Sequence, residues 1–177
     1  MIRAANEKDA DAICTIGIKS FRKTFGHLFR TDVLHRYLAE TYNTQKIERS
    51  IRDTENVYVV YEMNNTVIGF IKYKLNSTHS RILNSTQIQL QKLYVDPLAT
   101  EKGVGGQLLR RTITEMGIAS ETSVWLMVYE GNDLAKSFYQ KHGFTIIAED
   151  THDFENIRIN FNVMGLNMLF KANATNI

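Results

Sequence analysis

The stretch that decides the fold is QLQKLYVDP at residues 89–97, followed by LATEKGVGG at residues 98–106. Its first half is typical of a β-strand that Pro97 stops, since proline cannot donate to a strand ladder. Glycines at 103, 105 and 106 then open a helix. Such a strand–turn–helix junction presents backbone N–H groups at the positive end of a helix dipole, where phosphates bind. The stretch therefore predicts a phosphate site.

The spacing of these glycines excludes two common phosphate loops. A dinucleotide-binding fingerprint needs Gly-x-Gly-x-x-Gly, and a Walker A loop needs Gly-x-x-x-x-Gly-Lys-Ser/Thr. Gly103, Gly105 and Gly106 fit neither pattern. Glycines let a backbone approach a ligand closely, but they also let a helix begin close against a sheet. On these residues alone, the ligand site and the purely structural interpretation both stay open.

Upstream of this stretch, the sequence predicts one strand, three helices and a hairpin. Asn6 is a good helix N-cap, and the Asn64-Asn65 pair tolerates the positive φ of a hairpin turn. The expected elements are a strand at 2–4, helices from Asn6 to about Phe25, from Thr31 or Asp32 and from Asn43 or Thr44, strands at 57–61 and 66–73, and a polar surface loop at 76–85.

Downstream, strands and helices alternate. The nearly continuous apolar run at 124–128 is typical of a strand buried on both faces. Asn132 is placed to cap a helix that Gly143 ends. The expected elements are a strand at 86–95, a helix from 103 to about 119, strands at 124–128 and 144–147, a helix at 133–142, a polar loop at 150–156 and a strand at 157–170.

The order β-α-α-α-β-β-β-α-β-α-β-β predicts an α/β (α+β) fold with a mixed sheet and helices on both faces. With 177 residues, 44% hydrophobic and 23% charged, we expect one domain over residues 1–177. The net charge of +2 is too mild to indicate nucleic acid. No apolar run reaches membrane-helix length, the N-terminus lacks a signal-peptide core, and Cys14 is a lone buried thiol. We therefore expect a cytoplasmic protein without a membrane or nucleic-acid partner.

A second informative segment runs from Asn132 to Phe144. Ala135 and Tyr139 are four residues apart and so share a helix face, while Leu134 and Phe138 form an adjacent apolar pair. By itself, Tyr139 is better explained as an amphipathic core tyrosine whose hydroxyl reaches solvent. Its functional meaning depends on the two segments taken together.

Together these segments resemble the GNAT superfamily of acyl-CoA N-acetyltransferases. Leu93–Pro97 and Thr100–Gly105 stand where the family has a strand ending in Val-Asp/Glu-Pro and then Arg/Gln-x-x-Gly-x-Gly/Ala. The second family motif, Asn-x-x-Ala-x-x-Phe-Tyr-x-x-x-Gly-Phe, is matched from Asn132 to Phe144. The resemblance implies a mostly antiparallel central sheet of about seven strands. Within the superfamily, the chain looks most like the bacterial Pai-type spermidine/spermine acetyltransferases.

The resemblance also implies roles for particular residues, with acetyl-CoA as co-substrate. The pantetheine arm would pair with the strand backbone like an added strand, and N–H groups of the glycine loop would receive the pyrophosphate. Tyr139 would protonate the leaving thiolate. The implied cofactor-binding residues are Leu93, Tyr94, Val95, Thr100, Glu101, Lys102, Gly103, Val104, Gly105, Gly106, Asn132 and Lys141.

Two departures from the family pattern concern binding and proton transfer. Thr100 replaces the usual Arg or Gln, so one side-chain contact to the pyrophosphate is shortened or absent. Gln89 and Gln91 stand where many members carry a glutamate that acts as general base, and an amide cannot accept a proton. The remaining candidates for the base are Asp96, Glu130 and the histidines His27, His35, His79, His142 and His152, whose spacing does not suit a metal site.

The leading hypothesis is an N-acetyltransferase that moves an acetyl group from acetyl-CoA to a primary amine by direct attack in a ternary complex. The expected amine is a small molecule, with a polyamine such as spermidine as the candidate, and acidic residues would attract it. Candidates for that role are Glu40, Asp150, Asp153 and Glu155. The alternatives are a degenerate acyl-CoA-binding module and a peptide or protein N-acetyltransferase. Either a monomer or a homodimer is compatible with the sequence.

Overall fold

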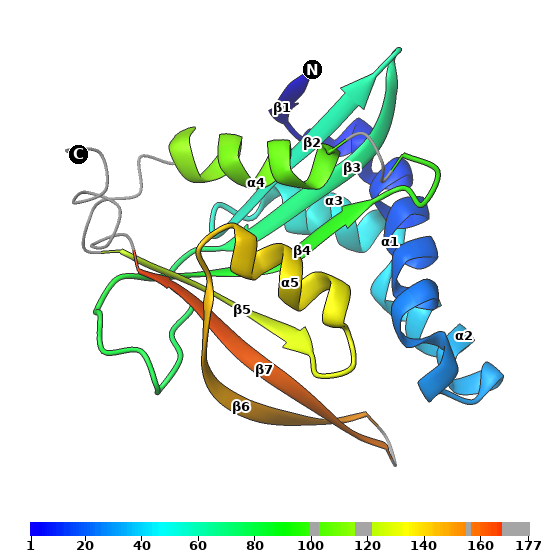
Figure 1. Cartoon of the computed structure of the whole chain (residues 1–177). Helices are drawn as coiled ribbons and strands as arrows, with labels where there is room; N and C mark the ends of the chain where they lie inside the picture. Colours follow the sequence, from blue (N-terminus) through cyan, green and yellow to red (C-terminus); the bar gives the residue numbers. More distant parts are fainter. Residues whose placement is uncertain (100–102, 116–121, 155–156, 168–177) are drawn as a thin grey trace. The chain divides into compact units, whose positions relative to one another are not determined.

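The computed structural model describes residues 1–99, 103–115, 122–154 and 157–167. Strands and helices follow one another in the expected order (Figure 1). The strands are β1 (Ile2–Ala4), β2 (Asn56–Met63), β3 (Thr66–Lys74), β4 (Gln87–Val95), β5 (Ser123–Tyr129), β6 (Thr145–Phe154) and β7 (Ile157–Asn167). The helices are α1 (Ala10–Phe25), α2 (Thr31–Thr41), α3 (Thr44–Arg52), α4 (Val104–Glu115) and α5 (Asp133–Lys141), with 3-10 turns at Glu7–Asp9 and Gly26–Leu28.

The strands form a seven-stranded sheet in the order β1-β2-β3-β4-β5-β7-β6. The β4–β5 pair is parallel, whereas the β1–β2, β5–β7 and β6–β7 pairs are antiparallel. This is the mixed, mostly antiparallel sheet with helices on both faces that the sequence predicts. The chain separates into two compact units, residues 1–73 with 92–114 and residues 74–91 with 115–177. The expectation of one domain stays a prediction.

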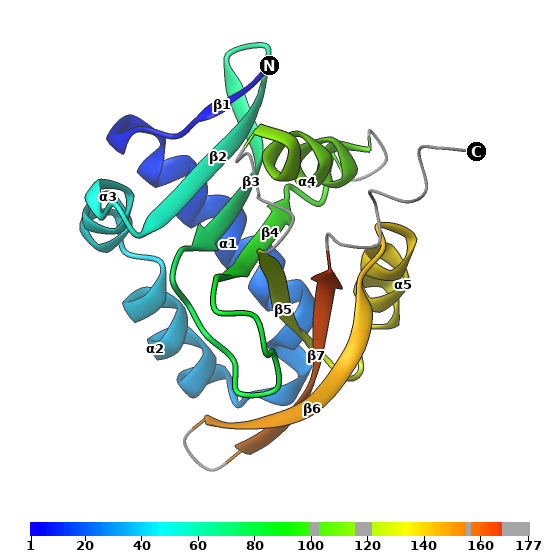
Figure 2. The ribbon, with the colours of Figure 1, turned by 90° about the vertical axis from the view of Figure 1, so that its left-hand side faces the viewer.

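Unit 1 contains β1 to β3, the end of β4 and helices α1 to α4. Within it, α4 covers one face of β2 and β3, and α1 and α3 cover the opposite face (Figures 1 and 2). Gly69 of β3 permits the close approach of α4, because a Cβ at this position would lie 3.1 Å from Val104 Cγ1. On the other face, a Cβ at Gly17 of α1 would lie 2.2 Å from the Tyr42 ring. Both helices thus pack where a glycine leaves room.

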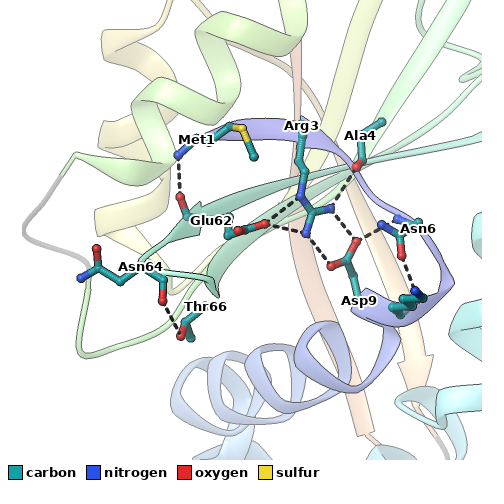
Figure 3. Close-up of polar contacts among 9 residues, drawn as sticks. Met1, Arg3, Ala4, Asn6, Asp9, Glu62, Asn64 and Thr66 are labelled. Atoms are coloured by element: carbon teal, nitrogen blue, oxygen red, sulfur yellow. Dashed lines mark hydrogen bonds and ion pairs between the residues drawn. The ribbon is translucent and has the colours of Figure 1, made fainter.

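An ionic cluster ties the first residues of the chain to unit 1 (Figure 3). The Arg3 guanidinium donates to both carboxylate oxygens of Asp9 at 2.8 Å, and its Nε donates to Glu62 at 2.8 Å. The Asn6 amide also donates to Asp9, and the Asn6 side chain accepts from the Lys8 amide, which gives a capping box. The predicted cap at Asn6 is confirmed, although the helix begins there with a 3-10 turn.

Unit 2 contains the start of β4, then β5 to β7 and α5. Helix α5 lies against one face of the β5–β7 pair (Figures 1 and 2). The loop at 76–85 is held by two side chains of the sheet. The Trp125 indole donates to the Ser77 carbonyl, and the Gln87 amide donates to the Ile82 and Asn84 carbonyls.

One element differs from the sequence prediction. Residues 150–154 belong to β6 and pair with β7 at residues 157–161, whereas the sequence predicts a polar loop at 150–156. The side chains of this part of β6 are mostly exposed, so hydrophobic alternation gives no strand signal. Pairing with β7 forms the strand instead. The ends of the predicted helix at 103–119 and of the strand at 157–170 lie partly outside the described residues.

Candidate active site

The end of β4 offers backbone groups of the kind that the sequence predicts. The Asp96 amide donates to the Ile68 carbonyl of β3, and the Tyr94 carbonyl approaches Gly69 of the same strand. Because alternate residues of a strand point their N–H and C=O groups to opposite edges, those of Leu93 and Val95 point away from β3. The parallel pairing of β4 with β5 covers Gln87–Leu90, and β4 continues to Val95.

The glycine-rich turn stands at the N-terminus of α4 in the same unit. Gly103 has φ +65°, which side chains other than glycine rarely adopt, and its carbonyl accepts from the Gln107 amide. Val104 is fully buried, with Gly105 and Gly106 half-buried beside it. The contacts of Gly69 place this helix start over β3 and β4, next to Tyr94. The predicted loop residues Thr100, Glu101 and Lys102 lie outside the described residues.

Helix α5 carries the residues predicted from the second motif. The Asn132 side chain accepts from the Ala135 amide at 3.1 Å, so Asn132 is the helix cap that the sequence predicts. The predicted hydrogen bond from Asn132 to pantetheine stays a prediction. Gly143 has φ +89° and ends the helix, and Lys141 lies exposed in the last turn. These residues belong to unit 2.

Tyr139 of α5 is only 9% exposed and packs among aromatic side chains. Its ring meets Phe138 and Phe144 edge to face, with centroids 5.2 and 5.6 Å apart. The Tyr139 carbonyl accepts from the Phe144 amide at 3.1 Å, which fixes the turn after the helix. The Tyr139 ring is therefore held in place by its aromatic neighbours, and its predicted role as an acid stays a prediction.

The two glutamines of β4 bind each other and a neighbouring loop. Gln91 Nε2 donates to Gln89 Oε1 at 3.0 Å, and the Ser77 hydroxyl donates to the same oxygen at 3.2 Å. Their amides thus serve a hydrogen-bond network of unit 2 and cannot accept a proton from an amine. The structure supplies no general base at either position.

The other candidates for the general base differ in their surroundings. Asp96 is paired with Lys19 at 2.9 Å, and this hydrogen bond, with one from the Leu98 amide, lowers the pKa of Asp96 and makes it a weak base. The His142 ring is bonded to the Phe138 carbonyl, and His79 packs on Trp125. His27, His35 and His152 are exposed. Glu130 is the candidate that lines a cavity formed by residues that the structure describes.

That cavity, of about 270 Å³, is a feature of unit 2 that the sequence does not predict as a whole. It is lined by Glu130, Glu149, Asp150, Thr151, Asn160, Phe161 and Asn162. Asn162 is 8% exposed and lines the cavity. Of the predicted acidic residues, Asp150 lines the cavity, whereas Asp153 is paired with Arg158 at 2.8 Å, Glu40 is exposed in α2 and Glu155 lies outside the described residues.

Lys92 is a second feature that sequence reasoning missed. It lies half-buried on β4, and its Nζ stands 5.0 Å from the Tyr42 ring centroid and 5.8 Å from that of Tyr94. Burial, together with the positive charges of Lys72 and Lys46, lowers the pKa of Lys92 to about 8. An unusual pKa of this kind is more frequent at functional sites than elsewhere.

No group of three or more His, Cys, Asp or Glu side chains in the described part of the chain is placed to hold a metal ion. No helix of the described residues is long and apolar enough to cross a membrane.

The amino-acid sequence is similar to those of known acetyltransferases. Residues 53–146 match the model of the acetyltransferase (GNAT) domain. A spermidine N(1)-acetyltransferase of Thermoplasma acidophilum is 25% identical over 157 residues, which cover 86% of this chain and 92% of that protein.

Solved structures give the same fold. The PaiA N-acetyltransferase of Thermoplasma acidophilum, in complex with coenzyme A, has a TM-score of 0.75 and 21% identity, covering 94% of this chain and 98% of that one. The ribosomal-protein-S18-alanine N-acetyltransferase of Escherichia coli has a TM-score of 0.68 and 18% identity, covering 95% and 93% of the two chains.

Proposed function

Because the chain belongs to the GNAT acetyltransferase family, we propose that it acetylates a primary amine of a polyamine such as spermidine. It is an acetyl-CoA-dependent N-acetyltransferase, and the choice of acceptor is the proposal. The observation that carries this choice is the acidic cavity of unit 2, which Glu130, Glu149 and Asp150 line. Similarity to a distant relative, the spermidine N(1)-acetyltransferase, also supports this choice of acceptor.

Acetyl-CoA would be held by backbone groups of unit 1. The edge of β4 at Leu93 and Val95 suits the two amides of pantetheine, which would bond to it as an added strand does. The N-terminus of α4, with Gly103 in a left-handed conformation, suits the pyrophosphate. Backbone donors keep this cradle intact although Thr100 replaces the usual side chain.

In the chemical step, the acceptor amine attacks the thioester carbon directly. The new C–N bond forms as the C–S bond breaks, and the sulfur leaves with the electron pair. Tyr139 would give its hydroxyl proton to that sulfur and recover one from the acylated nitrogen. A tyrosine near pKa ~10 and a thiol near ~8.5 are close enough for this transfer.

The cavity would hold a distal ammonium group of the polyamine. Glu149 pairs with Asn162 across the β6–β7 ladder, so these side chains lie on one face of the sheet. Glu130 and Asp150 add two further carboxylates. A site with several carboxylates, an amide oxygen and little apolar lining favours a small organic cation over a neutral or acidic group.

Substitution of the cavity carboxylates tests the choice of acceptor. In a Glu149→Gln/Asp150→Asn variant, we expect KM for spermidine to rise about three- to tenfold, because each partly exposed charge pair contributes about 0.2–1 kcal/mol. KM for butylamine, which has no distal charge, should not change. Asp153→Asn is the matched control, since it removes a carboxylate of the same strand that Arg158 already neutralises. Equal changes for both amines would contradict the polyamine assignment.

The hydrogen-bonded glutamines favour a second candidate, an acyl-CoA-binding module without turnover. Such a module would gain thermal stability with acetyl-CoA yet release no thiol with any amine. A panel that includes spermidine, butylamine, amino acids and peptides with free N-termini separates this module from a polyamine enzyme and from a peptide N-acetyltransferase.

A further inference from the structure

The loop between β3 and β4, residues 75–86, is bound to the sheet of unit 2 by hydrogen bonds. The buried Gln87 side chain accepts from the His79 amide at 2.6 Å and donates to two carbonyls of the loop. The Trp125 indole donates to the Ser77 carbonyl at 2.8 Å, and Trp125 is buried as well. Because buried side chains of two strands fix the loop backbone, the sheet determines where His79 lies.

The His79 side chain contacts Trp125 of β5 and Asp150 of β6. Its ring centroid is 5.0 Å from that of Trp125, and only 13% of the side chain is exposed. Its Nδ1 accepts from the Arg81 amide at 3.2 Å, which assigns the ring proton of the neutral imidazole to Nε2. That Nε2 faces Asp150 Oδ2 at 4.0 Å, the outer limit of an ion pair. The donor edge of the imidazole is therefore turned toward this carboxylate.

Asp150 is one of the carboxylates that line the cavity of unit 2. Its Oδ1 accepts from the Thr151 amide at 2.8 Å, and its Oδ2 faces His79. The Asp150 side chain is 46% exposed, so without these contacts it would sample several rotamers. Contacts on both oxygens favour one orientation of the carboxylate. A cation that binds there loses less free energy to the ordering of this side chain.

A second acidic side chain of β6 is held in a different way. Asp153 accepts from Arg158 at 2.8 Å, and the guanidinium neutralises its charge. A neutral imidazole, in contrast, orients a carboxylate without cancelling its charge. Asp150 therefore keeps a negative charge that faces the cavity, whereas Asp153 has already spent its charge on an arginine.

We propose that His79 is a positioning residue of the acceptor site, which acts through Asp150 and so favours acceptors with a distal ammonium group. The proposal rests on the proposed function, since it concerns the cavity that would hold this ammonium. His79 acts on Asp150 and on no reacting atom. Its loss should therefore change the selection of the amine and leave the chemical step as it is.

Two substitutions of His79 isolate its contact with Asp150. The amide nitrogen of glutamine reaches the position of Nε2, whereas the amide of asparagine reaches only that of Nδ1. His79→Gln therefore keeps the donor toward Asp150, and His79→Asn loses it. Both variants lose the ring contact with Trp125, so this loss cancels when the two are compared.

Steady-state kinetics with two amines compare these variants. We expect KM for spermidine to be about two- to fivefold higher in His79→Asn than in His79→Gln, because the contact is partly exposed. The value of kcat, and KM for butylamine, should be the same in both variants. Arg81→Met removes an exposed side chain of the same loop and is the control, which should match the wild type with both amines.

A double-mutant cycle shows whether His79 acts through Asp150. In an Asp150→Asn background, the two His79 variants should have the same KM for spermidine, because the charge that His79 orients is gone. In a Glu149→Gln background, which removes another carboxylate of the cavity, the difference should persist. A difference that survives Asp150→Asn, or no difference between the variants in the wild-type background, would overturn the proposal. Equal changes in KM for spermidine and butylamine would do so too, since they indicate an altered loop.

Nitrogen-15 NMR of the His79 ring completes the test without turnover. We expect the neutral ring to carry its proton on Nε2, and spermidine without acetyl-CoA to shift the Nε2 resonance in the wild type but not in Asp150→Asn. A proton on Nδ1 would overturn the proposal. If spermidine is acetylated but shifts no His79 resonance, the proposed function stands and the role of His79 fails. If spermidine shifts the resonance but no amine releases CoA, the proposed function fails, while the contact between His79 and a cation-binding Asp150 stands.

Discussion

Unit 1 holds two partly buried cations in opposite settings. Arg3 faces the carboxylates of Asp9 and Glu62, with bonds of 2.8 Å to both, and these contacts raise the pKa of Arg3 (Figure 3). Lys92 faces aromatic rings and two further lysines, and its pKa falls. The first setting holds its charge permanently, whereas the second allows the charge to be given up. The difference separates a cation that stabilises the fold from one whose charge costs stability.

Loss of the Arg3 side chain should have the larger effect on stability. An Arg3→Met variant leaves Asp9, whose side chain is 7% exposed, without its main partner, and we expect a loss of about 3 kcal/mol in the free energy of unfolding at pH 7. Urea unfolding followed by circular dichroism measures it. Arg52→Met, which breaks the exposed pair with Glu7, is the control and should cost less than about 1 kcal/mol.

The pH dependence of the free energy of unfolding in acid tests the cause of the Arg3 effect. The hydrogen bond from Arg3 holds the pKa of Asp9 below its usual value, so this contribution is present above the unfolded pKa of about 3.9 and disappears as pH falls through the folded pKa. The difference between the wild type and Arg3→Met should therefore shrink below pH 4. A difference that stays constant down to pH 2 would show that the two carboxylates are not the reason for it.

Substitution of Lys92 should have a smaller effect of the opposite sign. Below pH 8 the folded protein carries the Lys92 charge at a cost, so Lys92→Met should raise the free energy of unfolding at pH 7 by about 1–3 kcal/mol. The unfolded chain binds more protons between about pH 8 and 10.5, and wild-type stability should rise over that window relative to the variant. Unfolding of both proteins at pH 7, 9 and 10.5 checks this. A destabilised Lys92→Met variant at pH 7 would mean that the aromatic contacts outweigh the cost of burial.

Local signals explain what could be predicted from the sequence. Helix caps and turns depend on residue type and on near neighbours in the sequence, so they can be predicted. Examples are the caps at Asn6 and Asn132 and the positive φ of Asn64, Asn65 and Gly143. The β4 and α5 motifs likewise fix the family and its co-substrate.

The features that were missed depend on contacts between distant parts of the chain. Lys92 shows nothing unusual in its own strand, because its state is set by Tyr42 and Lys46, some 50 residues away in sequence. The acidic cavity includes Glu149 and Asp150, which belong to a strand that hydrophobic alternation does not reveal. In both cases the side chain is visible in the sequence, but its electrostatic surroundings are not.

The central claim is that the chain acetylates a polyamine, and release of free CoA on mixing acetyl-CoA with spermidine tests it most directly. A thiol reagent reports the release, and mass spectrometry of the product shows acetylation of one primary amine. We expect one thiol for each acetylated spermidine and slower release with butylamine at the same concentration. No thiol release with spermidine, or equal rates with both amines at every concentration, would contradict the claim.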